Sequence, residues 1–190
     1  MSFFDDTKNA GLLLLIIALM DIILTIVAAF AVEAYKDAEL WKKIVFIVGG
    51  IIGAAIYALL GFDIKGGKCR FDFMGLFSDV NSKFGVLVAI TAAVGVGDII
   101  SGLFTIIGFG GSGVFDIIIG VLFVVMAYLM VNGGNLAGNV IWIILLIIYI
   151  LGVIFGILAA ITLIGIPMLL LMIMLLVFLL SPEVKQRMGM

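Results

Sequence analysis

Two aspartates lie inside long apolar stretches of the sequence, where an ionised side chain is unexpected. Asp21 stands in "IALMDIILTIV" and Asp98 in "AAVGVGDIISGLFTII". Thr25 follows Asp21 by four positions and Ser101 follows Asp98 by three, so each acid shares a helical face with a hydroxyl. Oxygen ligands suit hard cations, and a carboxyl can also carry a proton. The spacing therefore predicts an ion-binding site formed by Asp21, Thr25, Asp98 and Ser101.

No basic residue in these stretches can neutralise the two acids. An ionised aspartate at the centre of a bilayer costs about 2.5–3.5 kcal/mol on insertion scales. We therefore expect a bound proton or sodium ion at Asp21 and Asp98, and no other cofactor or metal. The alternative is structural: each acid, carrying a proton, joins two helices by a hydrogen bond. Such bonds in membranes average only about 0.6 kcal/mol, which is small against the insertion cost.

Further polar residues extend the pattern around Asp98 and at the start of the next apolar stretch. Thr91 and Thr105 fall on the same helical face as Asp98 and predict a polar path along that helix. Asp116 follows Ser112 by four positions at the start of an apolar stretch, where negative charge suits a helix N-terminus. Ser112 and Asp116 are therefore interpreted as a helix cap.

Composition excludes several classes of protein. The chain has 190 residues, of which 66% are hydrophobic and 12% charged, far from the balance of a soluble domain. It has no histidine and one cysteine, Cys69, so zinc or haem ligation, Ser–His catalysis and an intramolecular disulfide are not expected. The candidate nucleophiles have no basic partner, so we expect no enzyme. A net charge of −2 without a basic stripe predicts no nucleic-acid partner.

The apolar stretches predict an all-α integral membrane protein that forms a single membrane domain over 1–190. About 20 apolar residues span the hydrocarbon of a bilayer. Spans are expected at about 11–32, 44–61, 84–107 and 114–131, with turns at 108–113 and 132–139. The uncharged segment 140–180 is about twice as long as one span, so we expect it to reverse within 156–167, with Pro167 in the first turn of the last span. Six spans result; five, with one long and kinked, is the alternative.

These spans pair as three hairpins, over 11–61, 84–131 and 140–180, followed by a tail at 181–190. The polar segment 62–83 is predicted to be a cytoplasmic loop. Its apolar and acidic residues alternate at helical spacing, which fits an amphipathic helix in the headgroup zone or, equally, a solvated loop anchored by phenylalanines. The residues concerned are Asp72, Phe73, Leu76, Phe77, Asp79 and Val80.

Basic residues favour one orientation. With six spans, seven of the ten Lys and Arg residues share the side of the two termini, and the other three lie between the first two spans. The positive-inside rule then places both termini in the cytoplasm, and we expect the plasma membrane of a prokaryote. The side of the termini holds Lys8, Lys65, Lys68, Arg70, Lys83, Lys185 and Arg187; the other side holds Lys36, Lys42 and Lys43.

Two further patterns in the sequence concern how the spans pack and how they are related to one another. Small residues recur at intervals of four in 93–101, 49–53 and 152–160, a spacing that lets helices approach closely. Segment 12–25 also aligns with 89–102 so that Asp21 matches Asp98, and Tyr57 matches Tyr128 further on. One interpretation of this alignment is a weak internal repeat of the kind found in transporters; the alternative is a chance match between apolar sequences.

Together these features predict a small polytopic membrane protein that translocates a small cation, or a solute coupled to one. The alternative is a non-transporting accessory or assembly subunit of a membrane complex. The expected partner is the lipid bilayer, with a homo-oligomer or a larger membrane complex as further hypotheses.

Overall fold

The structure, a computed structural model, describes residues 3, 6–70, 76, 79–163 and 165–190. Within these residues all regular elements are helices. Long apolar runs with only two prolines in the sequence account for this, since helices satisfy their own backbone hydrogen bonds in an apolar medium. The elements are α1 (Thr7–Ala31), α2 (Glu33–Lys36), α3 (Leu40–Gly66), α4 (Lys83–Phe109), the 3₁₀ helix η2 (Gly110–Gly113), α5 (Val114–Asn132), α6 (Gly134–Ala160), α7 (Ile166–Leu179) and α8 (Pro182–Arg187).

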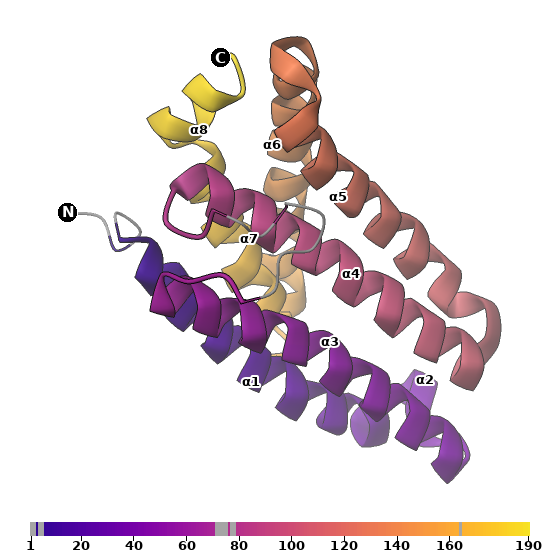
Figure 1. Cartoon of the computed structure of the whole chain (residues 1–190). Coiled ribbons are helices and arrows are strands. Elements are labelled where there is room, and N and C mark those ends of the chain that lie inside the picture. Colours follow the sequence, from indigo (N-terminus) through magenta and orange to yellow (C-terminus); the bar gives the residue numbers. More distant parts are fainter. Residues whose placement is uncertain (1–2, 4–5, 71–75, 77–78, 164) are drawn as a thin grey trace.

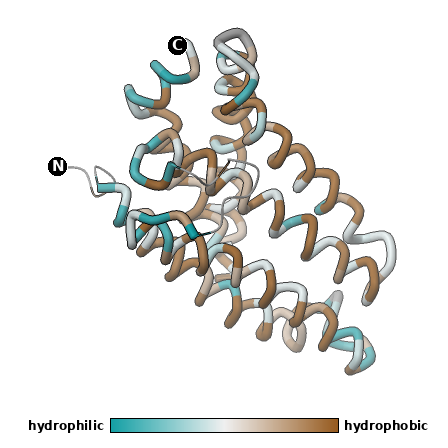
Figure 2. The backbone as a smooth tube through the Cα atoms, in the orientation of Figure 1, coloured by the Kyte–Doolittle hydropathy of each residue, from teal (hydrophilic) through white to brown (hydrophobic). Residues whose placement is uncertain are grey.

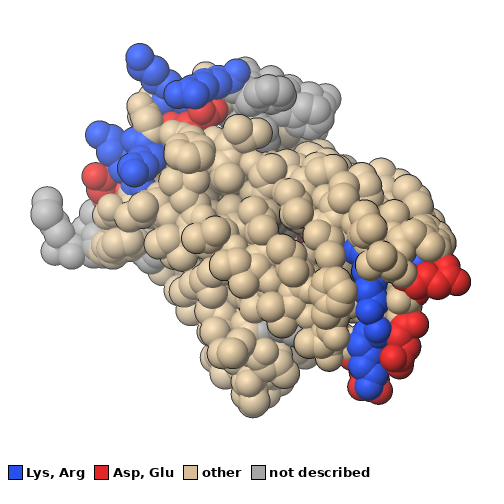
Figure 3. Space-filling model, turned by 90° about the horizontal axis from the view of Figure 1, so that it is seen from below, with Lys and Arg blue, Asp and Glu red and all other residues tan. Residues whose placement is uncertain are grey.

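Four helical segments in the described part of the chain are long and apolar enough to cross a membrane. They are Thr7–Ala31, Leu40–Gly66, Lys83–Asn132 and Ala137–Ala160, and the third comprises α4, η2 and α5. The apolar helix α7 is shorter. Charged side chains gather at two ends of the molecule, and the face between them in Figure 3 is largely uncharged. The same division into polar ends and hydrophobic middle is visible along the backbone in Figure 2. The chain is therefore a multi-pass, membrane-embedded protein.

Glycines set how closely neighbouring helices approach. A Cβ added at Gly11 of α1 would lie 2.6 Å from the Gly61 carbonyl oxygen of α3. A Cβ added at Gly120 of α5 would lie 2.5 Å from the Gly95 carbonyl oxygen of α4. Real Cβ atoms do not approach so closely, so these helix pairs touch backbone to backbone, as small residues permit in membranes. Figure 1 shows α1 beside α3, and α4 meeting α5 at η2; α7 packs against α1, α4 and α6.

The small residues expected at helix contacts take that role. A Cβ at Gly49 would lie 2.5 Å from Phe104 Cβ, so α3 meets α4 there. A Cβ at Gly152 would lie 2.8 Å from Met172 Cγ, so α6 meets α7 there. The packing prediction is confirmed at these positions. The proposed repeat is not matched in detail, because Tyr57 is buried whereas Tyr128 is 44% exposed.

The beginning of α1 and the whole of α8 lie at the same end of the molecule. Gly11, near the start of α1, touches Gly61 and Lys65 near the end of α3. The carboxylate of Glu183 in α8 accepts hydrogen bonds of 3.4 Å from the backbone N–H groups of Lys83 and Phe84, at the start of α4. The beginnings of α1 and α4, the end of α3 and the whole of α8 therefore share one end.

Several boundaries differ from those predicted. The turn expected at 132–139 is shorter than predicted, because α5 ends at Asn132 and α6 begins at Gly134, whose φ is +69°. The loop expected from residue 62 begins later, because α3 continues to Gly66. The helix is interrupted within 156–167, since α6 ends at Ala160 and α7 starts at Ile166, and Pro167 lies in the first turn of α7, as predicted.

The amphipathic helix considered for the 62–83 segment falls largely outside the described residues, which leave out Asp72, Phe73 and Phe77. Two of its expected apolar residues are described. Leu76 and Val80 are 2% and 1% exposed, so they are part of the packed interior and do not face headgroups. This burial contradicts the interfacial placement of these two side chains.

Candidate functional site

Three helices bring the polar residues of the apolar stretches together. Helix α1 carries Asp21 and Thr25 one turn apart, and α4 carries Asp98 and Ser101 one turn apart. Between them, α3 presents residues at helical spacing that have small side chains, apart from one tyrosine. These are Gly50, Gly53, Ala54 and Tyr57. The absence of bulky side chains on this face of α3 leaves space between α1 and α4.

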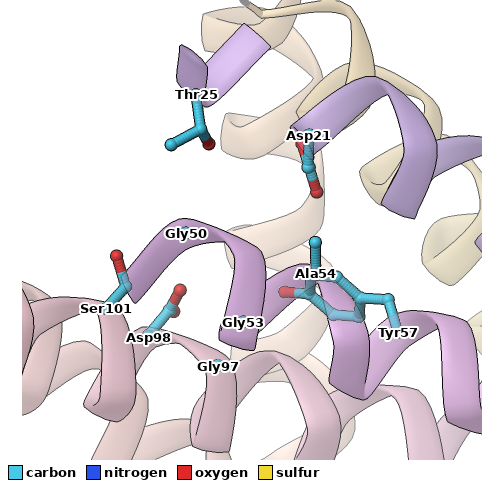
Figure 4. A pocket seen from close by; sticks show the side chains of 9 residues that line it. All are labelled: Asp21, Thr25, Gly50, Gly53, Ala54, Tyr57, Gly97, Asp98 and Ser101. Atoms are coloured by element: carbon cyan, nitrogen blue, oxygen red, sulfur yellow. The ribbon is translucent and has the colours of Figure 1, made fainter. Parts of the chain in front are cut away.

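This space is a cavity of about 180 Å³. It is lined by Asp21, Thr25, Gly50, Gly53, Ala54, Tyr57, Gly97, Asp98 and Ser101. Figure 4 shows how these side chains lie, with Asp21 and Thr25 on one helix and Asp98 and Ser101 on another, on either side of α3. A water molecule occupies about 30 Å³ in the liquid, so the cavity has room for several. We call it the polar cavity.

Within the described residues, neither carboxylate of the polar cavity takes part in a hydrogen bond or an ion pair with another side chain or backbone group. No Lys or Arg lines the cavity. In a low-dielectric surrounding, the charge of each carboxylate needs balance from a proton, a cation or ordered water.

Tyr57 separates the two acids on the side of α3. Its side chain is 9% exposed, and its hydroxyl lies 3.5 Å from the position that a Cβ on Gly97 would take, next to Asp98 in the chain. Within the described residues this hydroxyl makes no hydrogen bond, although it lines the polar cavity. A buried phenol usually has a partner, so the hydroxyl is available to a water or an ion in the cavity.

A second, larger cavity of about 610 Å³ is lined by the same two acids. Apart from Asp21, Tyr57 and Asp98, its lining consists of apolar residues and one glycine from α1, α4, α5, α6 and α7. They are Ile17, Val94, Phe115, Ile119, Phe123, Ile148, Leu151, Gly152, Phe155, Pro167, Met168, Leu171 and Met172. We call it the apolar chamber.

The structure brings together the four residues predicted to form the ion site. Asp21, Thr25, Asp98 and Ser101 all line the polar cavity, although they come from helices far apart in the sequence. Thr25 also packs on α3, since a Cβ at Gly50 would lie 2.7 Å from its Oγ1.

Thr91 and Thr105, which were predicted to form a polar path, do not lie at this site. Thr91 is fully buried; its hydroxyl donates to the Leu87 carbonyl oxygen at 2.7 Å and lies 3.0 Å from the Tyr149 hydroxyl of α6. Thr105 is 6% exposed. Neither threonine lines the polar cavity or the apolar chamber. The Thr91 hydroxyl links α4 to α6 through Tyr149, so it serves a contact between helices.

The predicted helix cap is placed differently. Gly113 occupies the N-cap position of α5, and no side chain makes a capping hydrogen bond there. Ser112 lies within η2, so its predicted capping role is wrong. Asp116 lies in the first turn of α5, as its position in the sequence indicates, and its negative charge there suits the helix dipole.

Sequence analysis missed Tyr57 and the small residues of α3 as parts of the site. Their signal was present, because Gly50, Gly53, Ala54 and Tyr57 have the spacing of one helical face. An apolar stretch without a charged residue gave no reason to assign that face to a cavity.

Comparisons of the chain with protein-family models, curated proteins and solved structures gave no match. The function is therefore argued from the site alone.

Proposed function

We propose that this protein moves a small cation, or a solute coupled to one, across a membrane through the polar cavity. The observation that supports this most strongly is that two carboxyl groups and two hydroxyls from α1 and α4 line one cavity without a basic partner. An arrangement of this kind is costly in an apolar surrounding unless a mobile positive charge balances it. Function at such a site is the default hypothesis for acids inside a membrane.

The four residues have different chemical roles. Asp21 and Asp98 are the binding groups, because only they supply negative charge. Thr25 and Ser101 supply neutral oxygen ligands one turn away. A proton or a sodium ion fits this donor set, since carboxylate, hydroxyl and water oxygens suit hard cations. The described residues contain no group of three or more His, Cys, Asp or Glu that could hold a metal ion.

We further propose that α5 and α7 also cross the membrane, which gives six crossings in three hairpins. Helix α5 has 19 residues, or about 28 Å at 1.5 Å per residue, close to the hydrocarbon thickness of about 30 Å. Helix α7 has 14 residues, or about 21 Å, so it crosses only where the bilayer thins or the adjoining turns enter it. The charge bias then places both termini in the cytoplasm of a prokaryotic cell.

Cation flux into proteoliposomes tests the proposal. Purified protein is reconstituted, and uptake of ²²Na⁺ and of protons is measured for the wild type and for Asp21→Asn, Asp98→Asn and the double variant. Asp37→Asn is the matched control, because Asp37 is an exposed aspartate that lines neither cavity. The proposal predicts that the double variant inserts and folds normally yet loses flux, while Asp37→Asn retains it.

Two results would count against transport. Flux of the double variant equal to that of the wild type would remove Asp21 and Asp98 from the pathway. A wild-type protein without flux of either ion, which copurifies from native membranes with a stoichiometric partner, would favour the alternative of an accessory or assembly subunit.

A further inference from the structure

The apolar chamber has the size and surface of a site for an organic molecule. Its volume of about 610 Å³ lies within the range of about 300–1,000 Å³ that is usual for small-molecule pockets. Aromatic side chains from two helices line it, namely Phe115 and Phe123 of α5 and Phe155 of α6. These aromatic side chains favour a molecule with an apolar, partly aromatic body, and they have no polar group that could bind a hydrated inorganic ion.

One wall of this chamber carries two carboxyl groups. Asp21 and Asp98 line the chamber as well as the polar cavity, and no Lys or Arg lines it. A neutral lipid tail would fill the apolar part and leave both carboxyl groups without a positive partner. A sodium ion would balance a carboxylate but leave the apolar walls empty. A molecule that matches the whole surface has a hydrophobic body and a positive charge.

Tyr57 supplies a second, independent feature at the same wall. Its side chain is 9% exposed, its hydroxyl makes no hydrogen bond within the described residues, and it lines both cavities. The face of an aromatic ring attracts an organic cation at close range. Tyr57 thus forms part of the same wall of the chamber as the two acids.

We propose that the apolar chamber binds a lipophilic organic cation, whose charged group lies against Asp21, Asp98 and Tyr57. This inference rests on the proposed function and names its substrate class. Because the two cavities share the two acids, the organic cation and the small cation compete for the same negative charge.

The chamber is reachable from outside the helix bundle. Phe115 and Phe155 are 69% and 59% exposed, and Met168 at the start of α7 is 42% exposed. These residues lie in parts of α5, α6 and α7 that are near η2 and the α6–α7 connection. A molecule that partitions into the bilayer can therefore enter between these helices.

The first test is binding of radiolabelled tetraphenylphosphonium to the purified protein in lipid nanodiscs. Two comparison compounds separate charge from apolar body: triphenylphosphine oxide is neutral, and tetramethylammonium lacks the large body. The proposal predicts saturable binding of tetraphenylphosphonium, at least about tenfold tighter than either comparison compound, and loss of that binding in the Asp21→Asn/Asp98→Asn variant. Equal binding of triphenylphosphine oxide, or unchanged binding to the double variant, would overturn it.

The second test fills the chamber without touching the acids. Ile119→Trp adds bulk inside the chamber, and Ile118→Trp is the matched control because Ile118 is 53% exposed and does not line it. Ile148→Trp on α6 repeats the test from another helix. We expect at least about tenfold weaker tetraphenylphosphonium binding for the two chamber variants, with ²²Na⁺ or proton flux retained, and no change for Ile118→Trp.

The outcomes separate this inference from the proposed function. Cation flux that depends on Asp21 and Asp98, in a protein that does not bind tetraphenylphosphonium, would overturn the inference and leave the proposed function standing. Absence of acid-dependent flux, with tetraphenylphosphonium bound, would overturn the proposed function and show the chamber to be a binding site only. Unchanged binding in folded Ile119→Trp and Ile148→Trp proteins would place the organic cation elsewhere.

Discussion

The hydrogen bond between Thr91 and Tyr149 allows a sharp prediction about how α4 is held to α6. The two hydroxyls lie 3.0 Å apart, and both side chains are fully buried. The Thr91 hydroxyl donates its hydrogen to the Leu87 carbonyl oxygen at 2.7 Å. Because that hydrogen is already used, the Tyr149 hydroxyl must be the donor of the interhelical bond, and Thr91 its acceptor.

Because Tyr149 is the donor, Tyr149→Phe and Thr91→Val should lower the stability of the protein by different amounts. Tyr149→Phe removes the donor but leaves Thr91 bonded to Leu87, so the loss is one membrane hydrogen bond, about 0.6 kcal/mol. Thr91→Val removes the same bond and leaves the Tyr149 hydroxyl buried without a partner, which costs about 1–3 kcal/mol. Loss of the local bond to Leu87 adds little, because such bonds do not stabilise helices.

The double variant completes the prediction. Replacing both partners by apolar groups of similar shape is nearly neutral, because no polar group is left unpaired. Thr91→Val/Tyr149→Phe should therefore be more stable than Thr91→Val alone, by about 1 kcal/mol. The free energy of unfolding is measured by denaturant titration in detergent micelles. Thr162→Val is the control, because the exposed Thr162 donates to the nearby Ala159 carbonyl oxygen and to no other group among the described residues.

The reasoning would be refuted by either of two results. In one, Tyr149→Phe is at least as destabilising as Thr91→Val. In the other, adding Tyr149→Phe to Thr91→Val lowers stability further. Both would mean that the Tyr149 hydroxyl finds another partner or that Thr91 is the donor.

Two further predictions concern the framework of the site. Gly120→Ala places a Cβ 2.5 Å from the Gly95 carbonyl oxygen and should destabilise the protein by about 1–3 kcal/mol in the same unfolding assay, whereas Gly111→Ala, with nothing within 4 Å, should leave stability unchanged. Glu183→Gln removes a negative charge from the start of α4 and should cost about 0.3–1 kcal/mol, with faster tryptic cleavage in α8; Glu33→Gln, at an exposed ion pair, should not alter this cleavage.

The sequence predicts the apolar helices well because hydropathy and length are properties of each segment by itself. Where contacts between segments decide the outcome, the prediction fails. The stretch 132–139 has the glycine and asparagine content of a turn, yet α6 begins at Gly134. Gly138 lies against the backbone at Met188, where a Cβ would be 2.7 Å from a carbonyl oxygen, so the helix packs closely on the end of α8.

The end of α3 illustrates the same limit. Asp63 was assigned to a polar loop because it is charged, but it lies in the helix and is 7% exposed. Its carboxylate accepts a 2.7 Å hydrogen bond from the Arg70 backbone N–H and lies 3.7 Å from the Arg70 guanidinium. A partner seven positions away satisfies this acid, and hydropathy alone does not reveal such a partner.

The candidate site was predictable as far as it depends on helical spacing. Asp98 and Ser101 share a face of α4 whatever the surrounding helices do, and so do Asp21 and Thr25 on α1. The same spacing placed Thr91 with this set, yet Thr91 contacts Tyr149 of α6 instead. Which residues of one face meet a cavity and which meet another helix depends on packing between helices, and that information lies outside any single stretch.

The central claim is that Asp21 and Asp98 are in contact with water and exchange positive charge with it. Infrared spectroscopy of the protein in lipid tests this directly, with carboxyl bands assigned from Asp21→Asn and Asp98→Asn. The account predicts bands that change reversibly with the pH of the bathing solution and shift promptly in D₂O. Bands that stay fixed over the whole pH range and do not shift in D₂O would mean that both acids are sealed in dry packing, which would contradict the account.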